Sequence, residues 1–217
     1  MKHLQIPFIN TQVAEAELIP ECLDQANIEW HPIDAHNWAE DYPYKPDVRF
    51  RIAHTGTEIL IHYDVHEACI RAIAPADNGP VWKDACCEFF IQPSEENIYY
   101  NLECNCAGTL LIGTHINGEH GPESTQEILQ GVKRWTSLGN GPKPLQDGDF
   151  HWQLALRIPA STFFLHHITQ FNGLTAHSNF FKCGDELTRP HFLSWNKVEV
   201  PKPNFHRPDF FGECTFE

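Results

Sequence analysis

Apolar and polar residues alternate along several segments of this chain, with the period of two that is typical of a β-strand with one buried face. In the segment 58–65, one face of the expected strand has Ile59, Ile61, Tyr63 and Val65, and the other has Glu58, Leu60, His62 and Asp64. A second segment does the same with Tyr100, Leu102, Cys104 and Cys106 against Asn101, Glu103 and Asn105. A third places on one face Phe150, Trp152, Leu154, Leu156 and Ile158. Each segment therefore predicts a half-buried strand.

Turn signals separate these segments, whereas helical patterns are few. Glycine and proline mark turns or loops at three places: 77–80, 118–126 and 137–148. Short helices are indicated only at 15–22, 124–130 and 158–167. Many strands and few short helices predict an all-β fold, an antiparallel β-sandwich. At 217 residues, the chain is expected to form a single domain over 1–217, with residues 1 to about 45 as an irregular N-terminal segment.

The segment 201–212, with the sequence PKPNFHRPDFFG, combines prolines that exclude a helix with aromatic residues that favour burial. We expect an ordered, extended strap whose Phe205, Phe210 and Phe211 pack across the sandwich. His206 within it is interpreted as a packing residue that is satisfied by hydrogen bonds.

The chain is acidic, because 15 lysines and arginines oppose 29 aspartates and glutamates and give a formal net charge of -14. No basic patch is visible, which argues against nucleic acid and anionic membranes as partners. No segment approaches the roughly 20 apolar residues of a membrane helix. A neutral glycan tolerates the acidity, and protein partners stay unknown.

The first residues, MKHLQIPFINTQVAEAE, contain neither the apolar stretch nor the small-residue cleavage site of a signal peptide. The sequence therefore predicts a cytoplasmic protein. A periplasmic or secreted location is the alternative if a signal has been removed.

Eight cysteines occur in the chain. An even number is compatible with disulfides in an exported protein, and clusters of cysteines can also hold a metal. Cys104 and Cys106 lie on the apolar side of one expected strand, and no CxxC pair is present. We expect reduced, buried thiols that act as small apolar residues, with disulfides and a metal site as alternatives.

Trp82 and Glu88 offer the chemistry of a sugar site. An indole can cover the apolar C–H face of a pyranose ring, and a fixed carboxylate can accept hydrogen bonds from the hydroxyl groups of the sugar. Composition alone favours Trp82 as a packing residue. Glu88 lies in the apolar strand ACCEFFI, where a carboxylate needs hydrogen-bond donors, an arginine or a calcium ion. Glu103 and Asn105, on a neighbouring expected strand, either serve the same site or face solvent.

Five stretches resemble the family 9 carbohydrate-binding modules, in the form common in gut Bacteroidetes-type bacteria. They are VRFRIAHTGTEILIHYDV, VWKDACCEFFIQP, YYNLECNCAGTLLIG, FHWQLALRIP and NFFKCGDELTRPHFLSWNKVEVPKPNFHRPDFFGECTFE. They extend from Val48 to the C-terminus, and the ending FHRPDFFG is the most specific of them.

The resemblance implies that a terminal sugar is held between two tryptophans, one of them six residues before a sugar-binding glutamate. Trp82 and Glu88 have this spacing. Trp195 is the expected second tryptophan, and Trp135 is its rival. Family members also bind structural calcium, but no EF-hand loop places such an ion here, so its ligands stay unknown.

The resemblance thus implies non-catalytic binding of a glycan or oligosaccharide in polysaccharide breakdown. Such modules occur within xylan-degrading enzymes, so a glycoside hydrolase, or an accessory part of one acting on xylan-like glycans, is the alternative. No GxSxG or HExxH motif is present. Haem ligation by an internal methionine is excluded, because Met1 is the only methionine. Asn179, Lys182 and Asp185 either line a pocket or cap a turn.

Overall fold

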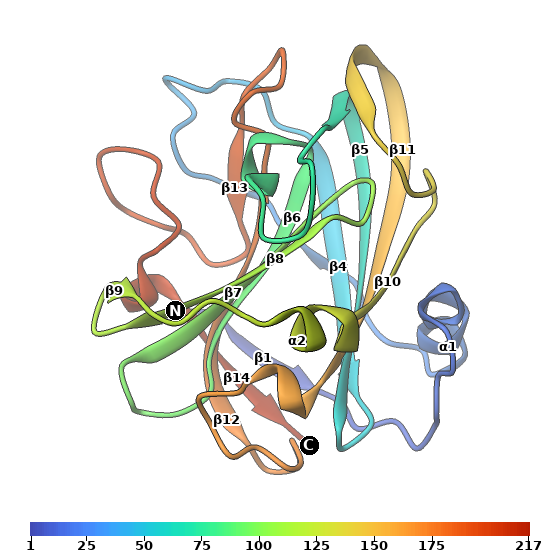
Figure 1. Ribbon diagram of the computed structural model, residues 1–217. Helices are drawn as coiled ribbons and strands as arrows, with labels where there is room; N and C mark the ends of the chain where they lie inside the picture. Colours follow the sequence, from blue (N-terminus) through green and yellow to red (C-terminus); the bar gives the residue numbers. More distant parts are fainter.

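The computed structural model describes residues 1–217 and consists of two β-sheets packed against each other (Figure 1). The nine-stranded sheet has the order β1 (His3–Ile6), β14 (Gly212–Phe216), β12 (Thr175–Cys183), β6 (Cys86–Gln92), β7 (Ile98–Asn105), β8 (Leu110–Ile116) and β9 (Glu119–His120). Beside β12 lie β13 (Phe192–Ser194) and then β3 (Ala35–His36). The five-stranded sheet has the order β10 (Lys133–Thr136), β11 (Lys143–Pro159), β5 (Glu58–Ala72), β4 (Asp47–His54) and β2 (His31–Pro32).

Helices are short. The α-helices are α1 (Ile19–Gln25) and α2 (Gln126–Gly131), and the 3₁₀ helices are Ala16–Leu18, Val81–Lys83, Ala160–Thr162 and Pro208–Phe210. The side chain of Thr125 caps α2 by accepting a hydrogen bond from the backbone N–H of Ile128. Neither α-helix is a candidate for a membrane span.

The core lies between the two sheets and follows the alternation of the sequence. Tyr100, Leu102 and Cys104 of β7 are buried in it, as are Ile61 and Tyr63 of β5. Two sheets with few short helices confirm the expected β-sandwich. Strand pairing is antiparallel except between β1 and β14, which run parallel.

The N-terminal segment differs from the expectation that residues 1 to about 45 are irregular. β1 completes the nine-stranded sheet by pairing with β14, and Leu4 and Ile6 of β1 join the core. Helix α1 packs on the outside of the five-stranded sheet (Figure 1), with Ile19 and Leu23 buried. A strand of four residues is too short to give a clear period, and the partner of β1 lies at the far end of the sequence.

A second apolar cluster covers part of the outer face of the nine-stranded sheet. The strap 201–212 supplies Phe205, which stacks on Phe181 of β12 at 4.1 Å between ring centroids, and Phe211, which is fully buried. Phe210 is partly buried. This packing agrees with the expected strap, and it leaves a hollow between the strap and strands β6 to β8.

Candidate functional site

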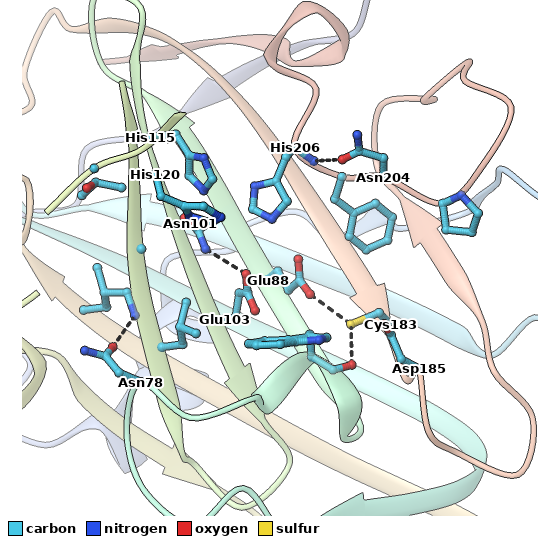
Figure 2. Close-up of a pocket in the computed structure, with 18 of the residues that line it drawn as sticks. Asn78, Glu88, Asn101, Glu103, His115, His120, Cys183, Asp185, Asn204 and His206 are labelled. Carbon is cyan, nitrogen blue, oxygen red and sulfur yellow. Dashed lines mark hydrogen bonds between the residues drawn. The ribbon is translucent and has the colours of Figure 1, made fainter. Parts of the chain in front are cut away.

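A cleft of about 850 Å³ opens on the outer face of the nine-stranded sheet (Figure 2). Its floor comes from β6, β7 and β8, and its walls come from the 3₁₀ helix Val81–Lys83, the β8–β9 hairpin and the strap. The residues used below are Trp82, Glu88, Asn101, Glu103, His115, His120, Cys183, Asp185, Lys202 and His206.

Trp82 lines the cleft and is 38% exposed. Val81 beside it is fully buried, and the Trp82 carbonyl accepts a backbone hydrogen bond from Asp185 at 3.3 Å. These contacts fix the short 3₁₀ helix while leaving the indole accessible. An accessible, rigidly carried indole is suited to contact the apolar face of a ligand.

Glu88 and Glu103 lie directly opposite one another on β6 and β7, and both are almost fully buried. Glu88 Oε1 accepts a hydrogen bond from the Cys183 thiol at 3.0 Å, and Glu103 Oε1 accepts one from Asn101 Nδ2 at 2.8 Å (Figure 2). Glu103 Oε2 and Asn101 Oδ1 are buried without a hydrogen-bond partner. The floor therefore presents acceptors that are free for a ligand.

The local electrostatics keep protons on this carboxylate pair. Burial raises the pKa of Glu103 to about 7. Burial, followed by the neighbouring Glu103 carboxylate, raises the pKa of Glu88 well above its usual range. Burial and Glu186 raise the pKa of Asp185 to about 6. At neutral pH the pair consequently retains at least one proton.

Three imidazoles, from β8, β9 and the strap, gather at one side of the cleft (Figure 2). The centroid of His115 lies 4.6 Å from those of both His120 and His206. Tyr99 stacks on His115 at 4.6 Å and forms a 3.1 Å hydrogen bond with His206 Nδ1. Burial and the neighbouring histidines lower the pKa values of His115 and His206 to about 4, so both rings are neutral at pH 7.

Trp195 does not fit the expected second stacking platform. It is 4% exposed and lies in the core, where its ring contacts Phe50 and Phe180 edge-to-face. Neither face is therefore available to a ligand in the cleft. Its rival Trp135 packs instead with the cluster around α1 and does not line the cleft.

Asn105 is also displaced from the expected site, although it lies on the same face of β7 as Glu103. It is fully buried, its Nδ2 donates to Asp84 Oδ2 at 2.9 Å, and its Oδ1 accepts from the backbone of Ala107 and Thr109. Asn105 thus braces the turn between β7 and β8.

The three polar residues near the C-terminal strands have different positions. Asp185 lines the cleft. Lys182 is fully buried on the opposite face of β12, where it pairs with Glu67 at 2.9 Å. Asn179 donates hydrogen bonds to the carbonyls of Asn196 and Phe210 and so ties β12 to the strap.

His115 and His120 are site residues that the sequence did not reveal. They lie in a hairpin without a distinctive motif, and they reach the cleft only because β8 pairs with β7. His206 has the expected hydrogen bond, but it also lines the cleft.

All eight cysteines are free thiols in the structure, and seven of them are buried. Two groups of side chains are spaced for a metal ion: Asp64, His66 and His151 on the five-stranded sheet, and Cys86, Glu88 and Cys183 on strands β6 and β12. Each group contains nitrogen or sulfur ligands, whereas calcium prefers oxygen. These groups therefore do not fit the calcium ion that the resemblance implied.

A sequence profile described as carbohydrate-binding family 9 matches residues 17–216. The chain belongs to this family. A crystal structure of a candidate carbohydrate-binding protein from Bacteroides uniformis ATCC 8492 shares 50% of its sequence with this chain. That similarity covers 100% of this chain and 99% of the other, with a TM-score of 0.96. The expected family resemblance is thereby confirmed.

Two structures of a family 9 carbohydrate-binding module from Caldicellulosiruptor kristjanssonii share the fold at lower identity. The complex with cellotriose gives a TM-score of 0.63 at 13% identity and covers 100% of this chain and 94% of the other. The complex with glucose gives 0.62 at 13% identity, with 100% and 96% covered. No curated protein matches the chain.

Proposed function

We propose that this carbohydrate-binding module holds a glycan or a sugar end in the cleft beside Trp82, without catalysis. The observation that carries the proposal is the combination of an accessible indole with the buried, inward-facing acceptors of Glu88, Glu103 and Asn101 in one cleft. Ligand clefts commonly combine apolar surface with a few convergent polar groups. Membership of a carbohydrate-binding family supports the assignment.

In this proposal each wall of the cleft has a distinct task. The Trp82 indole covers the apolar C–H face of a pyranose ring, and the carboxyl and amide oxygens of the floor accept hydrogen bonds from its hydroxyls. The imidazoles of His120 and His206, which are exposed, provide aromatic surface in place of a second tryptophan, and the buried His115 packs against both. A role in the breakdown of polysaccharides, including xylan-like glycans, is the biological setting that we propose with it.

Calorimetry with cellotriose and xylotriose tests the proposal. Trp82→Ala should weaken binding by about 1–3 kcal/mol, the range of comparable ring-stacking contacts. Trp30→Ala is the matched control, because Trp30 lies against Arg49 and Arg51 and does not line the cleft. Equal affinity of the Trp82→Ala and Trp30→Ala variants for a sugar that binds would contradict the proposal.

One observation favours hydrolysis of glycosidic bonds as a second candidate. Retaining glycosidases place two carboxyl groups about 5–5.5 Å apart. Glu88 and Glu103 lie directly opposite on antiparallel strands, which brings two carboxyl groups to the floor of the same cleft. Release of reducing sugar from xylan by the pure protein, abolished in Glu88→Gln, would support this candidate. We expect no such release.

A further inference from the structure

The floor of the cleft lacks a basic partner for its acids. Neither Glu88 nor Glu103 forms an ion pair, and their polar contacts come from the Cys183 thiol and the Asn101 amide. Lys182 is next to Phe181, the residue of β12 that pairs with Glu88, but its side chain lies on the opposite face of the sheet from the cleft. There it contacts Glu67 and His191. Adjacent buried carboxylates without a cation are costly, so a cationic ligand group would be bound strongly here.

Two unsatisfied acceptors mark where such a group would lie. Glu103 Oε2 and Asn101 Oδ1 are both buried, both belong to residues of the cleft lining and both lack a hydrogen-bond partner. A single hydroxyl group has one hydrogen to donate and no charge. An ammonium group has three N–H donors and a positive charge, so it can serve both acceptors and Glu88 together.

The cleft lining as a whole also has more acidic than basic side chains. Its formally charged side chains comprise four acids against one base: Glu88, Glu103, Glu123 and Asp185 against Lys202. Lys202 is exposed on the strap and forms no ion pair. The imidazoles of His115 and His206 are neutral at pH 7 and add no positive charge. A cleft lined mainly by one sign of charge attracts the opposite sign.

We infer that the cleft selects sugars with a free, protonated amino group, and that the ammonium lies against Glu88, Glu103 and Asn101 while the ring contacts Trp82. The inference rests on the proposed function, because it takes the cleft to be the sugar site. It adds the chemical class of the ligand, which is an amino sugar or a deacetylated glycan.

Binding of an ammonium group would also release protons. The pair retains at least one proton at neutral pH, and a cation seated beside it favours the ionised carboxylates. The titratable groups around the pair are Cys86, Cys183, Asp185, Tyr63, Tyr99 and Lys182, whose ammonium is already paired with Glu67. A neutral sugar brings no charge and should release few protons. Calorimetry in two buffers with different ionisation enthalpies counts the protons that are released.

Three β-1,4-linked disaccharides provide the test, because they differ only at carbon 2 of each ring. They are the glucosamine dimer, its N-acetylated counterpart and cellobiose. At pH 6 in EDTA, where the amino groups of the glucosamine dimer are mostly protonated before binding, we expect this dimer to bind about tenfold more tightly than cellobiose, as a charge-assisted hydrogen bond replaces a neutral one. Proton release should accompany only the glucosamine dimer.

Variants of single residues test whether the preference for the glucosamine dimer arises from the carboxyl pair. Glu103→Gln should reduce the preference for the glucosamine dimer to less than about threefold, because it removes a charge and keeps the shape. Glu119→Gln is the matched control, since Glu119 is exposed on β9 and does not line the cleft. Thermal melts establish that both variants are folded.

The outcomes separate this inference from the proposed function. If cellobiose binds at Trp82 as tightly as the glucosamine dimer, the inference is wrong and the sugar site stands. A preference that survives in both Glu103→Gln and Glu88→Gln overturns the inference as well. If none of the three disaccharides, cellotriose or xylotriose binds, the proposed function fails and the inference fails with it.

Discussion

The hydroxyl of Tyr99 and Nδ1 of His206 lie 3.1 Å apart, which links the central strand β7 to the strap at the edge of the cleft. The two residues are 107 positions apart in the sequence. The same strap places Phe205 on Phe181 in the apolar cluster beneath it. Stability and the shape of the cleft therefore depend on the same segment.

Truncation after Val200 should unfold the protein. It removes β14, which pairs with both β1 and β12, and the buried Phe205 and Phe211. Burial of each of these aromatic side chains contributes about 1.5–3 kcal/mol. Circular dichroism on heating should show no cooperative transition. A truncated protein that melts cooperatively but no longer binds sugar would identify the strap as a lid.

A milder pair of variants measures the same packing. Phe205→Ala should lower the free energy of unfolding by about 3–5 kcal/mol, because Phe205 lies in a well-packed cluster. Phe210→Ala should cost clearly less, since Phe210 is only partly buried. Urea unfolding of the two variants provides the comparison. Equal losses would mean that Phe205 is not an anchor of the strap.

Glu103 should make the protein less stable as the pH rises. Its pKa is raised from 4.5 to about 7 on folding, so the folded state binds more protons between these two values. The stability it contributes is present below pH 4.5 and is lost as the pH rises through 7, by about 2–3 kcal/mol. Glu103→Gln should therefore match the wild type at pH 4.5 and exceed it at pH 8.

Urea unfolding at the two pH values measures this effect, with Glu119→Gln as the control. A Glu103→Gln variant with the same stability difference from the wild type at both pH values would show that Glu103 titrates normally.

The buried histidines should have the opposite effect at acid pH. The pKa of His115 falls from 6.5 to about 4 on folding, so the unfolded state takes up a proton that the folded state does not. The free energy of unfolding should therefore fall by about 1–2 kcal/mol through His115 as the pH drops from 6.5 to 4. His115→Phe, which keeps an aromatic ring on Tyr99, should reduce this loss.

The measurement is the midpoint of urea unfolding at pH 7 and pH 4.5. His167→Phe is a control at an exposed histidine. An unchanged acid sensitivity in His115→Phe would assign the loss to other groups.

The eight cysteines should be reduced in the purified protein. Seven thiols are buried, so few should react with a thiol reagent before unfolding. Titration of the denatured, unreduced protein should find all eight. Cys86 and Cys183 are direct neighbours across β6 and β12, so a count of six would point first to this pair.

The sequence predicted the strands well where one face meets the core. The alternation in β5, β7 and β11 is visible because the face toward the other sheet selects apolar residues at every second position. The opposite faces of β7 and of most of β5 are buried as well, against the expectation of half-buried strands. The sequence pattern did not predict strand β1, whose four residues pair with β14, more than 200 positions away in the sequence. Local patterns contain no information about such a partner.

The cleft was predicted only in part. Trp82, Glu88 and Glu103 meet there, because the spacing of Trp82 and Glu88 and the face of β7 are local features. The direction of the Trp195 side chain depends on its packing against Phe50 of the other sheet, which its position in the sequence does not reveal. The histidine wall likewise depends on hairpin and strap geometry.

The parallel pairing of β1 with β14 has a mechanical consequence. His3 lies beside Glu213 and Ile6 beside Phe216, and backbone hydrogen bonds join the two strands at both ends, from Glu213 to Lys2 and from Glu217 to Ile6. A force that pulls the N- and C-terminal residues apart acts along these strands in opposite directions. The bonds between them are then loaded in shear and must break together, and not one after another. A tether attached at both ends of the module would therefore meet its strongest resistance at this seam.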